Sequence, residues 1–351
     1  MAQSEIDLLA IPPGDDLFYL LSYTPHLDER PCYLFVTQGD ALFLVPELNA
    51  AEAAPHVPFP TVTYSDAAGP QEALRGARMR LGARRQIAVG DTMRADALLL
   101  LQGTWGEARF MPGALVMVPL RMIKSPEEIA LLRRAAATAD AAVQAVFEAC
   151  GAGLREMDLA HVAEEAFRSL GVQQVPFAII GSGPNSAFPH HQSSSRVLQT
   201  GEPVLVDVGG RLEGYMSDIT RMAFVGTPTP RYREVHAVVE EAVTAALAMV
   251  RPGVAIREVD LAARRVIERD GYGAFFTHRT GHGIGITGHE LPSITHTNEM
   301  PLEAGMAFSV EPGIYLVGEF GVRLEEIVVV TERGGERLSA LGRDVKITRG
   351  T

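Results

Sequence analysis

The amino-acid sequence predicts an α/β domain over residues 1–120, followed by an α+β domain over residues 121–351. Three observations support this prediction. The first part alternates short apolar runs with helical patterns, a long capped helix begins at Ser125, and the second part combines four amphipathic helices with strands joined by short turns. A length of 351 residues also suggests about two domains.

In the first part, five apolar runs predict strands and two periodic segments predict helices. The expected strands are CYLFVTQGD (32–40), ALFLVPE (41–47), TVTYS (61–65), RQIAVGD (85–91) and ALVMVPL (114–120). The expected helices, QEALRGARMRLG (71–82) and RADALLLLQG (94–103), both end at glycine. This part contains no convincing cluster of catalytic side chains.

The second part starts with a helix whose N-terminus is marked by three residues. Ser125 is the expected N-cap, Pro126 the first helical residue and Glu128 the capping-box partner, and the helix should run to about Glu148. Three further helices are expected over 156–171, 232–253 and 256–271. Mostly antiparallel strands linked by hairpins are expected within 202–226, 304–316 and 322–339.

Composition and charge exclude several classes of protein. The net charge of −12 disfavours binding to nucleic acid or to an anionic membrane surface. The two cysteines, Cys32 and Cys150, are too far apart in the sequence to suggest a disulfide framework. The N-terminus lacks a signal-peptide pattern, and no apolar run is long enough to span a bilayer. We therefore expect a cytoplasmic protein that contacts no membrane.

Four carboxylates stand among apolar residues of the expected strands, where an unpaired charge would be costly to bury. They are Asp207, Asp218, Glu311 and Glu325. The segment GGRLEG between the two aspartates allows an antiparallel hairpin in which they face each other. Strand alternation should turn Glu326 to the opposite face from Glu325. A single acidic residue is more often at a strand edge or in solvent, but four together require cations, either Arg221 and Arg323 or, preferably, divalent metal ions.

The segment RTGHGIGITGHELPS (279–293) places His282 and His289 among glycines. It contains GxGxxG, but no strand and helix flank the motif as a dinucleotide site requires. A helical zinc site at His278 and His282 is also disfavoured, because glycines interrupt the segment. The glycines instead indicate a backbone that passes close to another group, so that His282 can reach a metal and His289 a substrate.

A second loop, SGPNSAFPHH (182–191), carries adjacent histidines. His190 is the expected functional residue and His191 a solvated neighbour, although the sequence leaves the reverse assignment open. The other histidines, such as His296, are expected to be structural or at the surface.

Together these motifs resemble the pita-bread metallopeptidases, namely methionine aminopeptidase, aminopeptidase P and prolidase. The resemblance covers residues 122–345 and includes VDVGG, SDITR, HRTGHGIGITGHELP, VEPGIY and GVRLEE. The N-terminal α/β domain resembles that of the branch containing prolidase, aminopeptidase P and creatinase. Creatinase lacks the metal ligands, and all five are present here.

The resemblance implies a site for two divalent metal ions, Mn(II) or Co(II) rather than Zn(II), although zinc stays possible. It implies that Asp207 binds one metal, that His282 and Glu311 bind the other, and that Asp218 and Glu325 bridge them. Glu311 would also carry a proton to the leaving proline nitrogen. The resemblance further implies that His190 and His289 bind the substrate carbonyl and the oxyanion, that His278 lines the proline side of the pocket, and that Arg323 orients the site by pairing with a carboxylate.

The implied substrates are small proline-containing peptides, and the preferred function is that of an Xaa-Pro dipeptidase. Some prolidases carry an arginine four residues after the equivalent of His289, where this chain has Ser293. Another cation, such as Arg30 delivered by a neighbouring subunit, could replace it. The alternatives are an aminopeptidase P that acts on longer peptides and an inactive binding module on the same fold. The relatives also suggest a homodimer.

Overall fold

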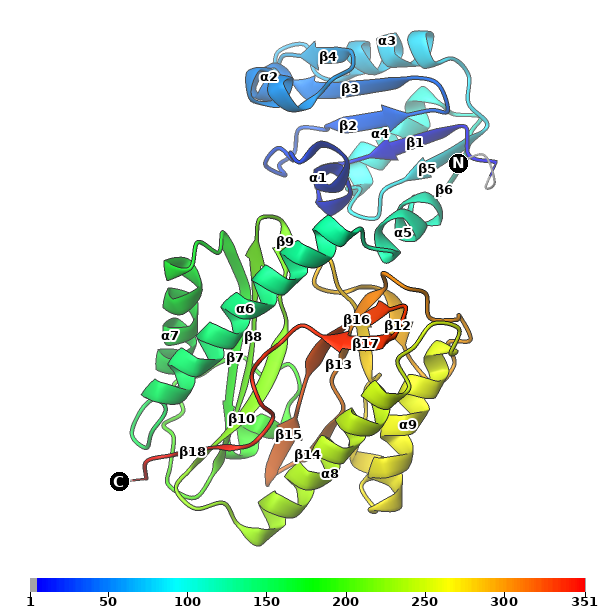
Figure 1. Ribbon diagram of the computed structural model, residues 1–351. Helices are drawn as coiled ribbons and strands as arrows, with labels where there is room; N and C mark the ends of the chain where they lie inside the picture. Colours follow the sequence, from blue (N-terminus) through cyan, green and yellow to red (C-terminus); the bar gives the residue numbers. More distant parts are fainter. Residues whose placement is uncertain (1–4, 351) are drawn as a thin grey trace. The chain divides into compact units, whose positions relative to one another are not determined.

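A computed structural model describes residues 5–350 of the chain. The chain divides into two compact units, of which the first ends at Arg121 and the second begins at Met122 (Figure 1). Each unit has its own hydrophobic core.

The first unit is built on a six-stranded mixed sheet with the strand order β4-β3-β2-β1-β5-β6. Along β1, Leu8 and Ala10 face a core shared with α3 and α4, whereas Leu9 and Ile11 face a core shared with α1 and α5. Helices therefore cover both faces of the sheet, as the α/β prediction requires. The elements are β1 (Leu8–Ile11), α1 (Asp15–Leu21), β2 (Tyr33–Val36), β3 (Ala41–Pro46), α2 (Glu47–Ala53), η2 (Ala54–His56), β4 (Thr61–Tyr64), α3 (Gln71–Leu81), β5 (Gln86–Val89), α4 (Ala95–Thr104), β6 (Arg109–Pro112) and α5 (Ala114–Met122).

One expected strand of this unit is wrong. Residues 114–120 form most of helix α5, with Pro119 inside it. Val116 and Met117 of this helix pack on the same sheet face as Leu17 of α1. A short apolar run does not by itself distinguish a buried strand from a buried helix, and here the neighbouring strand β6 already ends the sheet. The expected glycine end of the second helix is also shifted, because α4 continues through Gly103 to Thr104.

The second unit confirms the four predicted helices. The capping box of α6 is present, since the Ser125 side chain accepts a hydrogen bond from the Glu128 amide and the Glu128 carboxylate accepts one from the Ser125 amide. The elements are α6 (Pro126–Ala149), α7 (Glu156–Ser169), β7 (Gln174–Ser182), η3 (Gly183–Ala187), β8 (Pro203–Leu212), β9 (Tyr215–Met216), β10 (Ile219–Val225), α8 (Pro230–Ala248), α9 (Ile256–Arg269), η4 (Gly273–Phe275), β11 (Gly281–Gly283), β12 (Glu290–Ile294), β13 (Ala307–Val310), β14 (Gly313–Leu316), β15 (Phe320–Arg323), β16 (Glu326–Thr331), β17 (Gly334–Arg337) and β18 (Lys346–Thr348).

The first sheet of this unit has the order β18-β10-β8-β7, and β9 pairs with β8. Helix α6 packs against β8 and helix α7 against β7 (Figure 1). Along β8, Val204, Val206 and Val208 join the core formed with these helices. Because strand side chains alternate, Asp207 points to the other face of the sheet, away from α6 and α7.

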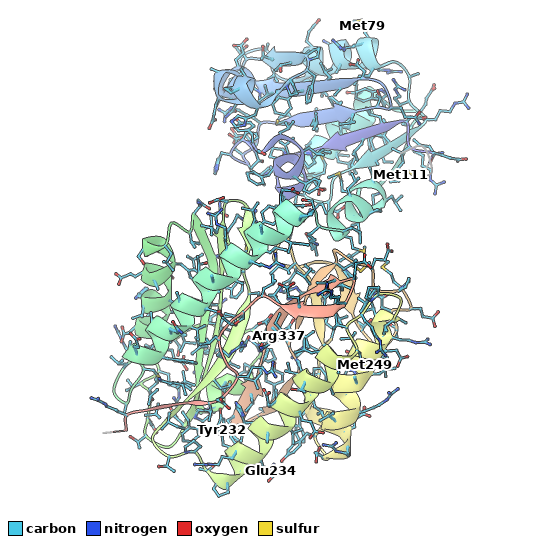
Figure 2. All side chains as sticks on the ribbon, in the orientation of Figure 1. Met79, Met111, Tyr232, Glu234, Met249 and Arg337 are labelled. Carbon is cyan, nitrogen blue, oxygen red and sulfur yellow. The ribbon has the colours of Figure 1, made fainter. Side chains whose placement is uncertain are left out.

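The second sheet has the order β12-β11-β13-β16-β17 and is antiparallel throughout. Helix α8 packs along α9 and against β13, and α9 contacts β12 (Figure 1). Tyr232 of α8, labelled in Figure 2, is buried between Phe224 of β10 and Phe320 of β15, with ring centroids 4.8 and 5.5 Å away. This aromatic contact links helix α8 to strand β10 of the first sheet and to strand β15 of the hairpin β14-β15.

No helix in the described part of the chain is long and apolar enough to cross a membrane. Cys32 and Cys150 are both buried and free.

Candidate functional site

The five expected metal ligands come from five places in the second unit. Asp207 lies within β8 and His282 within β11. The other three were expected inside strands but lie at strand ends, with Asp218 just before β10, Glu311 just after β13 and Glu325 just before β16. A break in the strand frees the side chain from strict alternation, so residues from both sheets can meet at one point.

The two aspartates do not face each other as expected. In the β8–β10 pair, Asp207 lies opposite Thr220, and Asp218 precedes the first paired residue of β10, Ile219. The turn explains the shift: β8 continues to Leu212, and Glu213 and Gly214 form a tight turn with φ angles of 49° and 88°. A two-residue turn with two positive φ angles makes the hairpin longer than the sequence GGRLEG indicated.

The candidate metal ligands form overlapping groups of nitrogen and oxygen atoms within 4.8 Å of one another. One group contains Asp207, Asp218 and Glu325, and another contains His282, Glu311 and Glu325. The two groups share Glu325, as two neighbouring cations with a bridging carboxylate would require. A third group joins His289 to Asp218 and His282.

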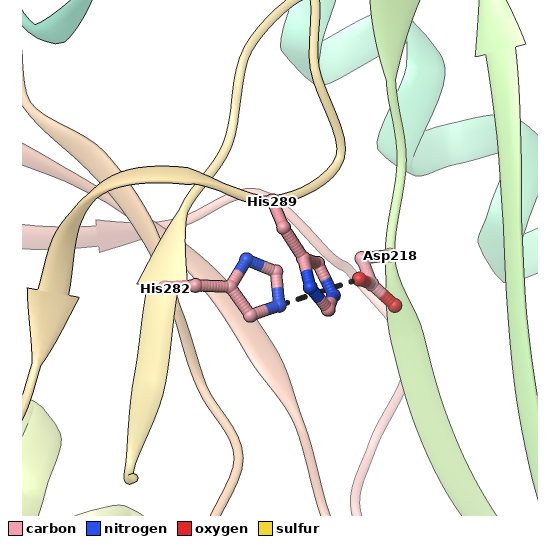
Figure 3. A group of neighbouring side chains, drawn as sticks. All are labelled: Asp218, His282 and His289. Carbon is pink, nitrogen blue, oxygen red and sulfur yellow. Dashed lines mark ion pairs between the residues drawn. The ribbon is translucent and has the colours of Figure 1, made fainter. Parts of the chain in front are cut away.

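His282 is held in the orientation that a metal ligand needs (Figure 3). Its Nδ1 donates to the Gly283 carbonyl oxygen over 3.0 Å, so in the neutral ring Nε2 carries the lone pair. Burial, followed by the charge of nearby His289, lowers the pKa of His282 to about 3, so the ring is neutral at pH 7. Yet Nε2 lies 3.3 Å from Glu311 Oε1 and 3.7 Å from Asp218 Oδ2.

The lone pair of His282 Nε2 faces carboxylate oxygens, and a cation between the nitrogen and these oxygens is needed to make the contact favourable. Two further observations also indicate a cation at this place. Asp207 Oδ1 and Glu325 Oε1 are buried and have no hydrogen-bond partner among residues 5–350. Burial and the neighbouring carboxylates raise the pKa of Asp218 and of Glu325 well above the usual value. Burial also raises the pKa of Glu311, to about 7. One nitrogen and several carboxylate oxygens therefore fit divalent cations.

Arg323 lies at one side of this cluster and pairs with a carboxylate, as expected from the sequence. Its guanidinium donates to Asp207 and, over 2.9 Å, to the hydroxyl of Tyr315. His278 donates from Nδ1 to the carbonyl oxygen of Arg279 over 2.7 Å, so its Nε2 accepts from the Tyr315 hydroxyl over 2.8 Å. A hydrogen-bonded chain thus runs from Asp207 through Arg323 and Tyr315 to His278.

The two histidines of the second loop have different surroundings. His190 lines the cavity over the carboxylate cluster, whereas His191 Nε2 lies 2.8 Å from Glu156 Oε2. The Glu156 carboxylate is fully buried and also accepts hydrogen bonds from Ser182 and Ser194. Glu156 therefore holds both ends of the loop that carries His190 through hydrogen bonds. Of the two histidines, His190 is the one that lines the cavity.

All nine candidate site residues lie around a single cavity of about 950 Å³. Its lining contains His190, Asp207, Asp218, His278, His282, His289, Glu311, Arg323 and Glu325. Apolar side chains of Phe177, Ile179 and Phe188 complete the wall. His190 and His289 are exposed in the cavity, so both are accessible to a ligand.

The glycines of the histidine segment serve a different purpose from the one expected. A Cβ on Gly281 would overlap the carbonyl oxygen of Ser309, and one on Gly283 would overlap that of Leu291. The close neighbours are therefore the flanking strands β13 and β12 rather than a ligand.

The sequence alone did not reveal three further residues at or near the site, namely Tyr315, Glu156 and Arg279. These are common residue types, and only their tertiary contacts distinguish them.

The sequence of the chain matches two known domain families. Residues 130–332 match the metallopeptidase family M24, and residues 1–123 match the creatinase/prolidase N-terminal domain. The chain is 38% identical over 335 residues to a probable dipeptidase PepE of Mycobacterium tuberculosis, a match that covers 93% of this chain and 88% of that protein. It is 32% identical over 346 residues to an Xaa-Pro dipeptidase of Pyrococcus furiosus, with 98% and 97% covered.

Solved structures agree with this assignment. A recombinant prolidase from Thermococcus sibiricus superposes with a TM-score of 0.95 at 32% identity, covering 99% of this chain and 96% of that one. The second unit accordingly has the pita-bread fold, and M24 metallopeptidases use a pair of divalent metal ions, for which the carboxylate and histidine cluster is suited. This chain belongs to the metallopeptidase family M24, in the branch that carries the creatinase/prolidase N-terminal domain.

Proposed function

We propose that this chain is a dinuclear-metal Xaa-Pro dipeptidase that hydrolyses the imido bond before proline. The observation that carries the proposal is the His282 nitrogen directed at the carboxylates of Glu311 and Asp218, inside a cavity where His190 and His289 are accessible. The dipeptidases among its relatives, similar over nearly their whole length, support the same substrate class.

The proposed ligands are Asp207, Asp218, His282, Glu311 and Glu325. When bound, two divalent cations would polarise the scissile carbonyl and lower the pKa of water in the site. The oxygen-rich donor set favours Mn(II) or Co(II), with Zn(II) as a third choice.

The remaining side chains position the substrate and move protons. Glu311 lies at the edge of the cluster, partly accessible from the cavity, and would carry a proton to the proline nitrogen as the bond breaks. His190 and His289 would donate hydrogen bonds to the carbonyl oxygen as it becomes negatively charged. The neutral His278 ring, held by Tyr315, would form the wall beside the pyrrolidine ring of the substrate.

Rates on matched peptides test this function. The metal-free protein should gain activity with Mn(II), and Ala-Pro should be cleaved faster than Ala-Pro-Gly. Preference for the tripeptide would show an aminopeptidase P instead. Tight binding of proline peptides without cleavage would indicate a binding module. Homodimer formation and a cytoplasmic location are further proposals, which sedimentation and fractionation would test.

A further inference from the structure

The side chains of Asp260 and Arg264 form an ion pair, one turn apart on helix α9. Arg264 Nε donates to Asp260 Oδ2 over 2.7 Å, and Nη2 donates to Oδ1 over 3.1 Å. The side chain of Asp260 is fully buried, and that of Arg264 is 20% exposed. Burying an ion pair removes both charges from water, which offsets much of their attraction. The other hydrogen bonds of the pair indicate what it holds in place.

Arg264 binds the backbone of the segment 276–280, which lies between η4 and β11 and forms neither helix nor strand. Its Nη2 donates to the carbonyl oxygen of His278 over 2.7 Å, and its Nη1 donates to that of Phe276 over 3.4 Å. The guanidinium also lies over the Phe276 ring, 4.3 Å from the centroid, and this ring meets the His278 ring edge-on at 5.2 Å. Arg264 therefore contacts both the backbone of His278 and the aromatic ring beside it.

Asp260 fixes the other end of the same segment, at Thr280. Its Oδ1 accepts hydrogen bonds from the Thr280 amide over 3.0 Å and from the Thr280 hydroxyl over 2.8 Å. The carbonyl oxygen of Thr280 in turn accepts from the amide of Glu311 over 2.8 Å. The chain therefore enters β11 at a position set by the buried carboxylate and by the neighbouring strand.

The segment held in this way forms one wall of the cavity. Thr277, His278 and Arg279 are consecutive lining residues, whereas none of the described residues of α9 lines the cavity. Because the segment forms no regular secondary structure, its carbonyl groups depend on side-chain donors such as Arg264. The ion pair thus supports the cavity wall from behind, without contact with a bound substrate.

We propose that Arg264, fixed by Asp260, is a positioning residue that acts through His278 to shape the proline side of the cavity. This inference rests on the proposed Xaa-Pro dipeptidase function. The guanidinium suits this role because its planar set of donors can bind a carboxylate and two carbonyl groups at the same time.

A double-mutant cycle with His278 tests the proposal. With Ala-Pro and saturating Mn(II), Arg264→Met should lower kcat/KM about 10- to 100-fold, mainly by raising KM, because the wall is displaced. In a His278→Ala background the same substitution should change kcat/KM by at most about 2-fold, because the residue through which it acts is gone. The metal bound per chain, measured by elemental analysis, should stay unchanged.

Two further variants complete the experiment. Arg264→Lys covers the case in which Arg264→Met does not fold. One ammonium can keep the ion pair but cannot also bind both carbonyl groups, so KM should lie between those of wild type and Arg264→Met. Arg265→Met is the matched control, because Arg265 is the next residue on α9, has a 67% exposed side chain and lies outside the cavity lining. It should retain the wild-type KM.

The outcomes separate this inference from the proposed function. If wild-type protein with Mn(II) does not cleave Ala-Pro, the proposed function fails. If wild type cleaves it and both Arg264 variants have the wild-type KM, only the role of Arg264 is overturned. An equal loss in the presence and absence of the His278 side chain also overturns it, because a merely structural residue would act in both backgrounds. Loss of bound metal in Arg264→Met would show that the ion pair supports the metal ligands instead.

Discussion

The guanidinium of Arg221 lies 3.0 Å from the carboxylate of Glu326, and both side chains are fully buried. Glu326 immediately follows Glu325, whose carboxylate faces the metal cluster. Arg337 and Arg343 also contact Glu326, each at 3.1 Å. The two adjacent glutamates at the start of β16 therefore have opposite environments: Glu325 faces the metal cluster, and Glu326 is surrounded by arginines.

This contrast predicts opposite effects of two matched substitutions. Glu325→Gln should lower kcat at least about 1000-fold and reduce the metal bound per chain, because a shared ligand is lost. Glu326→Gln should leave the metal content of the folded protein intact but cost about 3 kcal/mol in the free energy of unfolding, because Arg221 keeps a buried charge. Elemental analysis and urea unfolding measure the two effects. Equal loss of metal in both variants would contradict the assignment.

Removal of metal should destabilise the second unit. Asp207, Asp218, Glu311 and Glu325 crowd their charges around a buried point, and a chelator would leave them to repel one another. We expect a lower melting temperature after chelation and recovery with Mn(II) or Co(II), as ligand binding to the native state requires. Scanning calorimetry before and after chelation measures this. In metal-free protein, Glu325→Gln should be more stable than wild type, because one of the crowded ionisable carboxyl groups, whose burial is unfavourable, is gone.

The fold and the cluster were predicted well where local signals were strong. The capping residues Ser125 and Glu128 defined the start of α6, and buried acids such as Asp207 among valines indicated a site. Other features depend on tertiary contacts. Residues 114–120 became a helix because Met117 packs on a sheet face that periodicity does not reveal.

The strand register and the residues that surround the metal ligands also depend on tertiary contacts that the sequence does not show. The turn at Glu213 and Gly214 placed Asp207 opposite Thr220 rather than Asp218, and the sequence GGRLEG allowed either pairing. The position of Arg279 beside Ser293 follows from the pairing of β11 with β12, so only the three-dimensional structure reveals it.

Glu156 should make stability depend on pH in the acidic range. Burial raises its pKa, but hydrogen bonds from Ser194, His191 and Ser182 outweigh burial and lower the pKa to about 2. A carboxyl whose pKa is lower in the folded state adds stability above its unfolded value, 4.5, and this contribution is lost as the pH falls toward about 2. The full contribution is about 3 kcal/mol.

Unfolding of wild type and Glu156→Gln at several pH values tests this dependence. The difference in unfolding free energy should be largest at pH 6 to 7 and should shrink below about pH 4.5. Glu165→Gln is a matched control, because its position is on the same helix, α7, outside this hydrogen-bond network. A difference that stays constant from pH 7 to pH 3 would show that the Glu156 charge does not contribute.

Arg323 should orient the catalytic cluster through geometry as well as charge. Its guanidinium contacts Asp207, Tyr315 and, over 3.1 Å from Nε, the hydroxyl of Thr220. A lysine keeps the charge but cannot make these three contacts in one plane. We expect Arg323→Lys to lower kcat about 10- to 100-fold while the protein stays folded, because residues that orient metal ligands have effects of this size.

Tyr315→Phe separates the two parts of this arrangement. It removes the hydroxyl between Arg323 and His278 but leaves the contact between Arg323 and Asp207. If the chain to His278 positions the proline side of the cavity, Tyr315→Phe should raise KM for Ala-Pro several-fold and change kcat less than Arg323→Lys does. Steady-state kinetics with saturating Mn(II) distinguish the two variants. A larger fall in kcat for Tyr315→Phe than for Arg323→Lys would place the catalytic influence in the tyrosine hydroxyl rather than in the pairing of Arg323 with Asp207.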